Sequence, residues 1–382
     1  MKRLLLVQPS LQPPGGGNGV AAWVLEALKS DFATSVLTLD PIDLHAINRF
    51  FGTALHPSEF TVLRAYPRLR RVLEKVPIPL SRLKSSMLLR RCKQIADDFD
   101  LLIGVNNEID FGRPGIQYIH FPWAYSPRPP VDLRWYHASA AVVNVYYRLC
   151  TRIADFDFER MKQNLTLVNS DWTGTKVRER HGIGSVTLYP AVAATFPHVP
   201  WADREDGFVC VGRWSPEKEL DKVIDIVAAL RARGRDVHLH LIGSAGDLRY
   251  VRGIRRRAQQ HATWLFLEEN LSRSALIRLV AAHRYGIHGM TEEHFGMAVA
   301  EMVGAGCIVF VPPGGGQQEI VNRDARLTYA AREEAVAKIM AVLDNSELQQ
   351  TLRHDLALQR DLFSTARFVQ CLRQIAKDAC EG

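Results

Sequence analysis

The chain has few cysteines and no long uninterrupted apolar segment. Its six cysteines are scattered over 382 residues, and none belongs to a Cys-x-x-Cys pair. This spacing excludes a zinc knuckle or a disulfide framework and favours a reducing compartment. No segment reaches the roughly 20 apolar residues that a membrane span needs. The apolar start, Leu4 to Val7, ends at Gln8-Pro9 and is too short for a signal peptide, so we expect a cytoplasmic protein.

Several functional signatures are also missing. The chain contains no G-x-S-x-G, H-E-x-x-H or P-loop motif, which removes the common serine hydrolases, zinc proteases and P-loop nucleotidases. It has no helix-turn-helix, zinc finger or aromatic RNA-binding motif, so we expect no nucleic-acid partner. His238 and His240 share one face of a predicted strand but have no further ligand nearby in the sequence, so we expect no zinc site there.

The composition is that of a folded globular protein. Apolar residues make up 47% of the chain and charged residues 23%, and the length allows two separate cores. The net charge of +7 is uneven, because residues 64–93 hold ten basic residues and one acid, Glu74. Two interpretations stay open for this segment: a solvated helix pair, or a surface that contacts an anionic membrane. The second would place the protein peripherally at the inner face of a membrane.

Strand-like and helix-like segments alternate along both halves of the chain. This alternation predicts two parallel sheets with helical crossovers, whose ligands bind at the carboxyl ends of the strands. In the first half the predicted strands are Arg3–Val7, Ser35–Leu39, Leu101–Val105, Gln117–His120 and Leu165–Asn169. In the second half they are Phe208–Gly212, Val237–Gly243, Trp264–Leu267, Tyr285–His288 and Ile308–Val311.

Three segments of the chain predict helices next to strand ends or at the end of the chain. Gly19 to Lys29 has apolar residues at helical spacing. Ser215 suits an N-cap and Pro216 a first helical turn, so a second helix is expected to start there. An amphipathic helix follows Phe363-Ser364 at the end of the chain.

The most informative segment carries two carboxylates with seven residues between them. Glu293 precedes a Phe-Gly turn, and Glu301 lies further along the short helix that the pattern predicts. Carboxylates accept hydrogen bonds from hydroxyl groups, and the amides of a helix N-terminus bind phosphate. A site that offers both suits a sugar joined to a nucleotide diphosphate.

This segment resembles the Glu-x7-Glu motif of the retaining GT-B glycosyltransferases, family 4 in particular. Its Glu-His-Phe-Gly wording is closest to the branch that mannosylates dolichol-linked oligosaccharides, although His288 to Thr291 stands where many relatives have Pro-Ser. The resemblance implies an α/β GT-B fold with two facing, doubly wound, Rossmann-like domains and an interdomain cleft. These are an acceptor domain, 1–190, completed by the C-terminal helix 364–382, and a nucleotide-sugar-binding domain, 191–363.

The resemblance also implies roles for residues around the motif. Glu293 would hold hydroxyls of the donor sugar, and Glu301 would bind the nucleotide ribose. Phe295, Gly296 and Met297 would contribute to donor binding. Gly212 to Lys218 matches the strand-to-helix turn in which Arg213 and Lys218 grip the donor diphosphate, with Gly212 and Gly243 close to the nucleotide. The sequence places Lys218 in the first turn of a helix, where a bound anion offsets the unfavourable macrodipole.

A glycine-rich loop, Pro13 to Gly19, precedes the first predicted helix. In the resembling family a comparable loop closes over the donor phosphate, which implies donor contacts at Gly17 and Gly19. A rival interpretation is a dinucleotide fingerprint, G-x-G-x-x-A, with Asp40 as the ribose ligand. It is disfavoured because these glycines lie well beyond the first strand, whereas the fingerprint turns directly off a strand.

Further strand ends carry polar side chains. His120 ends a predicted strand, and the resemblance implies a hydrogen bond from it to a sugar hydroxyl. Asn169-Ser170 is expected to cap a helix. Gly314 to Val321 matches a family turn, in which Glu319 either binds ligand or caps the next helix. The aromatic segment from Pro122 to Tyr147 is a candidate acceptor surface.

The implied activity is a retaining, metal-independent transfer from a GDP- or UDP-linked sugar to a saccharide, lipid-linked or natural-product hydroxyl. No cofactor is expected, because Arg213 and Lys218 would take the place of a metal ion. Two Asp-x-Asp pairs, Asp98/Asp100 and Asp155/Asp157, match the metal motif of other glycosyltransferases only by their spacing. Two alternatives stay open: a non-catalytic GT-B protein that binds carbohydrate or membrane, and a nucleotide-sugar epimerase.

Overall fold

The computed structural model describes residues 1–13, 15–66, 80–122, 140–193 and 195–381. The chain divides into two compact units. The first contains residues 1–191 together with 365–382, and the second contains residues 192–364. In the described part of the chain, no helix is both long enough and apolar enough to cross a membrane.

The first unit is built on a parallel sheet of seven strands in the order β3-β2-β1-β4-β5-β6-β7. Its strands are β1 (Arg3–Val7), β2 (Ala33–Thr38), β3 (Phe60–Arg64), β4 (Leu101–Gly104), β5 (Ile116–Ile119), β6 (Leu165–Val168) and β7 (Val186–Thr187). Its helices are α1 (Gly16–Leu28), α2 (Leu44–Phe51), α4 (Ser81–Ile95), α5 (Ala140–Ala154), α6 (Phe158–Lys162), α7 (Asp171–His181) and α15 (Thr365–Glu381).

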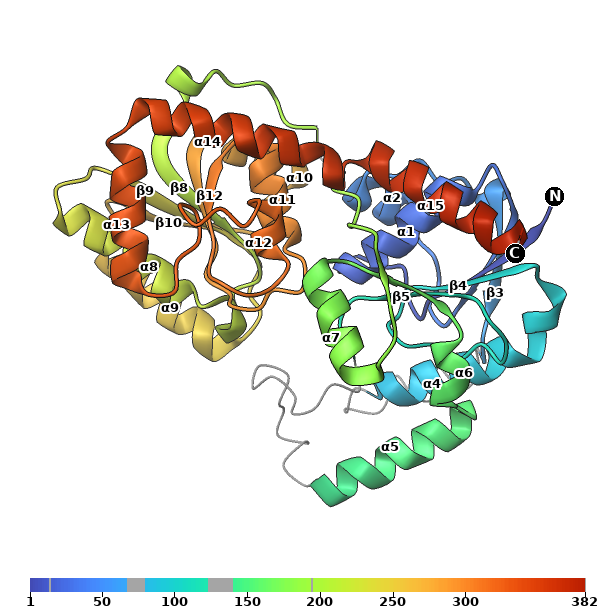
Figure 1. The fold of residues 1–382 in the computed structure, drawn as a ribbon. Helices are drawn as coiled ribbons and strands as arrows, with labels where there is room; N and C mark the ends of the chain where they lie inside the picture. Colours follow the sequence, from blue (N-terminus) through green and yellow to red (C-terminus); the bar gives the residue numbers. More distant parts are fainter. Residues whose placement is uncertain (14, 67–79, 123–139, 194, 382) are drawn as a thin grey trace. The chain divides into compact units, whose positions relative to one another are not determined.

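The last helix belongs to the first unit although the second unit precedes it in the chain. α15 lies alongside α1 (Figure 1), and its Phe368, Leu372 and Ala376 are buried in the same core as β1. Arg373 donates a hydrogen bond of 2.8 Å to the carbonyl of Ala27 at the end of α1. The amphipathic pattern after Ser364 thus marks a face that packs on α1.

The second unit repeats the plan with five parallel strands in the order β10-β9-β8-β11-β12. Its strands are β8 (Glu205–Val211), β9 (His238–Gly243), β10 (Leu265–Glu269), β11 (His283–Ile287) and β12 (Ile308–Phe310). Its helices are α8 (Leu220–Ala232), α9 (Leu248–Gln260), α10 (Arg273–Ala281), α11 (Met297–Gly304), α12 (Gln317–Ile320), α13 (Arg332–Leu343) and α14 (Ser346–Gln359).

In both sheets the strand order reverses beside the first strand, which is the doubly wound arrangement expected from the sequence. The predicted starts of two helices are wrong. α1 begins at Gly16, three residues early, so Gly17 and Gly19 lie inside the helix. α8 begins at Leu220, because Glu219 adopts a left-handed φ of 48° and separates it from the 3₁₀ turn Pro216–Lys218.

Candidate active site

The backbones of β8 and β9 approach each other closely at their carboxyl ends, where Gly212 follows β8 and Gly243 ends β9. A Cβ atom on Gly243 would lie 1.9 Å from the carbonyl oxygen of Gly212, so only glycine fits there. The Trp214 amide donates to the carbonyl of Ser244 at 2.9 Å, and the Trp214 side chain is buried. The backbone of 212–215 is therefore held at the sheet edge where doubly wound domains bind ligands.

Lys218 lies in the 3₁₀ turn before α8 and not in the first turn of α8, which corrects the sequence expectation. Its ammonium contacts the carboxylate of Glu293 and lies 3.3 Å from the sulfur of Met290. Ser215 precedes this turn, but its side chain caps nothing and its hydroxyl has no hydrogen-bond partner in the described chain. The prediction that Ser215 caps a helix is therefore wrong, and so is the prediction that α8 starts directly after it.

Glu293 lies in the loop between β11 and α11 and is largely buried. Its carboxylate lies 3.3 Å from Nε2 of His288. Burial opposes ionisation of Glu293, but the His288 imidazole and the Lys218 ammonium outweigh it and hold the pKa of this carboxyl well below its usual range. Glu293 is therefore an ionised hydrogen-bond acceptor at neutral pH.

A glycine turn holds the Glu293 loop in place. The Gly316 amide donates to the carbonyl of Glu293 at 2.7 Å, and the Gln317 side chain donates to the carbonyl of Met290 at 3.2 Å. Gly315 has a φ of 80°, and a Cβ atom there would lie 2.4 Å from the carbonyl oxygen of Glu293. The turn therefore needs glycine for its conformation and for its close approach to the loop. Glu319 lies within α12, so it does not act as the cap of that helix.

The helix α11 starts at the turn after Glu293. Gly296 is its N-cap residue, with a φ of 107°, and Met297 is its first residue. The Phe295 ring is buried, with its centroid 6.4 Å from that of Phe363. The first amides of α11, those of residues 297–299, therefore follow Glu293 by four to six residues, which is compatible with the expected phosphate-binding helix.

Glu301 lies further along α11 and pairs with Arg273, whose guanidinium is 2.7 Å away. Arg273 begins α10, so this ion pair joins two helices. The expected ribose contact of Glu301 stays a prediction. Arg213 differs from Lys218 in exposure: its side chain is 67% exposed, and its nearest described acid is Glu217, 3.6 Å away.

Buried polar atoms gather in these loops without partners in the described chain: Nε1 of Trp214, Oγ of Ser215 and Oε1 of Gln317. Such atoms are rare in folded proteins, and their usual explanation is a ligand or water. Sequence reasoning did not select Trp214, His288 or Gln317 as site residues. His288 directly follows a buried strand, which is the one signal that could have found it.

A second group of polar residues lies in the first unit. His120 follows β5, and its Nε2 lies 3.0 Å from the carbonyl oxygen of Val105. A Cβ atom on Gly17 would lie 3.0 Å from the same nitrogen, so the first turn of α1 and His120 do come together. Asn169 donates to the carbonyl of His120 at 3.1 Å. Gly19 instead faces Phe51, whose ring lies 3.0 Å from where its Cβ would be.

Other expected features have structural partners. Ser170 caps α7 by accepting from the Thr173 amide at 3.1 Å, as predicted. Asp100 accepts from the Arg3 amide at 2.6 Å, and Asp157 caps α6. Each of these Asp-x-Asp motifs thus has at least one carboxylate engaged by the fold.

The basic and aromatic segments are only partly described. Residues 67–79 of the basic segment and residues 123–139 of the candidate acceptor surface lie outside the described residues. Within the described part, Lys93 pairs with buried Asp110 at 2.7 Å, and Arg82 lies 4.0 Å from the centre of the Tyr147 ring. These two cations therefore support the fold, and membrane contact stays a prediction.

Comparison with known proteins supports one family. Residues 193–355 match the family described as "Glycosyl transferases group 1". The chain is 23% identical over 250 residues to a GDP-Man:Man(3)GlcNAc(2)-PP-Dol alpha-1,2-mannosyltransferase of Dictyostelium discoideum, covering 59% of this chain and 48% of that protein. For the Mus musculus protein of the same name, identity is 22% over 398 residues, covering 90% of this chain and 80% of that protein. The chain thus spans about half the length of the first of these relatives.

Solved structures agree on the fold. Anabaena Alr3699/HepE in complex with UDP and glucose superposes with a TM-score of 0.67 at 16% identity, covering 99% of this chain and 100% of that one. WaaG, a glycosyltransferase involved in lipopolysaccharide biosynthesis, gives 0.65 at 13% identity, with 99% and 100% covered. The GT-B fold and the resemblance to family 4 that the sequence indicated are both confirmed.

Proposed function

We propose that this protein transfers a sugar from a nucleotide diphosphate to an acceptor hydroxyl, because residues 193–355 match the family described as group 1 glycosyl transferases. One observation carries the proposal: Lys218, His288 and the Glu293 carboxylate meet beside the N-terminus of α11. The Lys218 ammonium and the amides of a helix N-terminus suit a diphosphate, and an ionised carboxylate suits sugar hydroxyls.

The ion pair between Lys218 and Glu293 suggests how the donor is held. A bound diphosphate would draw the Lys218 ammonium to its oxygens, while Glu293 accepts hydrogen bonds from hydroxyls of the sugar. Arg213 is exposed at the same strand end and would reach the diphosphate from solvent. Each cation stabilises the charge that builds on the diphosphate as the bond from C1 to oxygen breaks.

The remaining steps follow from the chemistry of the transfer. The acceptor oxygen forms its bond to C1 on the face that the diphosphate leaves, which retains the anomeric configuration. The departing diphosphate takes the electron pair of the broken bond, and the acceptor hydroxyl gives its proton to a phosphate oxygen. Lys218 and Arg213 perform the charge stabilisation that a metal ion performs in other enzymes, so the transfer needs no metal.

Two donors deserve testing first. The relatives are named for GDP-mannose, and the HepE structure holds UDP and glucose. The acceptor is a saccharide, free or linked to lipid, as the mannosyltransferase names suggest. A panel of GDP- and UDP-sugars, incubated with EDTA and with or without saccharide acceptors, tests the proposal.

We expect product only when an acceptor is present, and thermal stabilisation by the nucleotide of the active donor. Conversion of the donor without an acceptor would indicate an epimerase, and carbohydrate binding without turnover would indicate a binding protein. Activity that disappears with EDTA and returns with manganese would contradict the metal-independent mechanism.

A further inference from the structure

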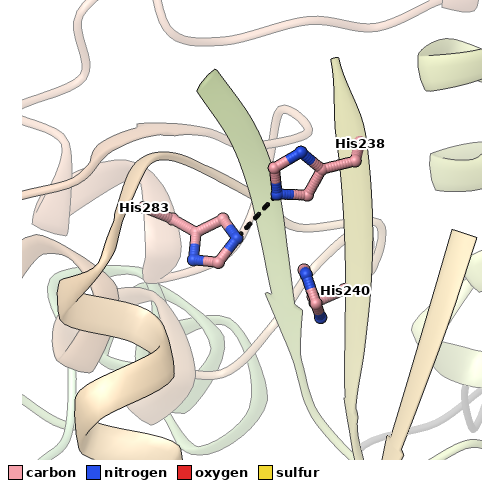
Figure 2. Close-up of side chains that lie close together, drawn as sticks. All are labelled: His238, His240 and His283. Atoms are coloured by element: carbon pink, nitrogen blue, oxygen red, sulfur yellow. Dashed lines mark hydrogen bonds between the residues drawn. The ribbon is translucent and has the colours of Figure 1, made fainter. Parts of the chain in front are cut away.

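Three histidines come together at the amino end of the second sheet. His238 and His240 lie on β9, His283 begins β11, and one ring nitrogen of each lies within 4.8 Å of the other two (Figure 2). The Nε2 atoms of His238 and His283 are 2.9 Å apart. We propose that these three residues, the histidine triad, bind one zinc ion, because three imidazoles are a common protein ligand set for zinc.

A glycine in the strand between β9 and β11 leaves space for the histidine rings to approach each other. β8 runs between β9 and β11, and its Gly207 pairs with His238 in the parallel register. A Cβ atom on Gly207 would lie 2.2 Å from Nε2 of His238. The imidazole can therefore cross over β8 and reach His283 on the far side only because this position lacks a side chain.

Hydrogen bonds to the other ring nitrogens orient two of the three ligands. Nδ1 of His283 donates to the carbonyl of Leu279 at 2.7 Å, and Nδ1 of His240 donates to the Glu268 carboxylate at 3.0 Å. Each bond leaves the Nε2 lone pair of its ring available to a metal. Protein sites use this arrangement to fix the tautomer of a ligating histidine.

A fourth ligand and an approach for the ion are also present. A carboxylate oxygen of Glu205 lies 3.4 Å from Nε2 of His238, and its side chain is 57% exposed, so it or a water can complete a tetrahedron. The side chains of His238 and His240 are partly exposed, whereas His283 is fully buried. An ion can therefore reach the triad from solvent.

Nε2 of His238 and Nε2 of His283 form a hydrogen bond, in which one ring donates and the other accepts. A zinc ion would replace the proton that the two Nε2 atoms share.

The triad and the candidate active site lie at opposite ends of β11. His283 starts this strand and His288 follows its last residue, a separation of about 16 Å along the strand. The ion would thus join β9 and β11 across β8, at the end of the sheet away from the donor site. We expect it to raise stability and to leave sugar transfer unchanged.

Titration of the EDTA-treated, desalted protein tests the proposal. Calorimetry with zinc should show one equivalent bound and a raised melting temperature, and cobalt should give the intense visible bands of a tetrahedral site. His238→Gln and His240→Gln should each weaken zinc binding at least 10-fold, and Glu268→Gln about 10- to 100-fold. His198→Gln, at an exposed histidine of the same unit, is the matched control and should bind zinc normally.

Zinc binding that does not saturate near one equivalent would overturn the proposal. Equal affinity in His238→Gln, His240→Gln and the control would overturn it as well. Failure of sugar transfer alone would leave it standing, because its readout is metal binding.

Discussion

Lys218 and Glu293 form an ion pair in the second unit although 75 residues separate them along the chain. Lys218 follows the end of β8, and Glu293 follows the end of β11, the strand beside β8 in the sheet. The pair therefore exists because a parallel sheet brings the carboxyl ends of neighbouring strands together. It also keeps a largely buried cation and a largely buried anion at the point where a charged donor is proposed to bind.

Replacing Lys218 with Met should lower kcat roughly 100- to 1000-fold, because one preorganised charge on the departing diphosphate is lost. Lys222→Met is the matched control, since Lys222 lies one turn further on and its side chain is 65% exposed. Initial rates at saturating donor separate the two variants. Equal rates for both would contradict the role of Lys218.

The same substitution should raise the pKa of Glu293, because only the His288 imidazole would then oppose the effect of burial on this carboxyl. In the unmodified protein the carboxyl stays ionised as the pH falls, since its pKa lies well below the usual range. In Lys218→Met, protonation should begin at a higher pH. Carbon NMR of labelled glutamate carboxyls can follow this, with Glu293→Gln identifying the signal. An unchanged titration would show that Lys218 does not stabilise the carboxylate.

Arg213→Ala should reduce activity about 10- to 1000-fold without changing the melting temperature, because its side chain is mostly exposed and its only described ion pair is at the surface. Arg233→Ala provides an exposed control at the far end of α8. Paired measurements of kcat/KM and thermal unfolding test both parts. A large loss of stability would point to a packing role for Arg213.

Gly315→Ala and Gly234→Ala compare two glycines with nearly equal left-handed φ values, 80° and 84°. An added Cβ meets nothing within 4 Å at Gly234 but would clash with the Glu293 backbone at Gly315. We expect Gly234→Ala to cost about 1 kcal/mol of unfolding free energy and Gly315→Ala about 2–4 kcal/mol with a loss of activity. Denaturant unfolding and rate measurements check this, and equal costs would contradict the close approach.

Stability should fall as the pH drops from about 6.5 to about 4, because His283 has a lower pKa in the folded protein than in the unfolded chain. The unfolded chain binds the proton first in this window, and the full effect is on the order of 3 kcal/mol. His283→Asn keeps a donor for the Leu279 carbonyl and should flatten the dependence. Unfolding curves measured with EDTA at several pH values test this prediction. An identical pH dependence of the unfolding free energy in both proteins would refute the assignment to His283.

Much of the fold was predictable from apolar runs. The strands with fully buried faces, such as β1 and β4, are found at nearly the predicted positions. β3 was missed because most of its residues are exposed, and β7 because it has two residues. Helix starts were harder, since a single left-handed residue such as Glu219 moves the start without changing the apolar pattern.

The individual residues of the candidate site were predictable from the sequence, but the contacts between them were not. Glu293 and Lys218 follow from motif and strand-end position, whereas their pairing depends on which strands are neighbours. The histidine triad shows the same limit. His283 lies far from His238 in sequence, and the two meet only because β9 and β11 flank a strand with glycine at the crossing point.

The placement of α15 has a consequence for synthesis. Phe368, Leu372 and Ala376 complete the core that β1 and α1 begin. During translation the core of the first unit therefore stays incomplete until the ribosome has made the whole second unit and α15. A premature stop near Thr365 would expose the apolar side chains of α1 that α15 covers, which favours aggregation, even though it removes none of the donor-site residues.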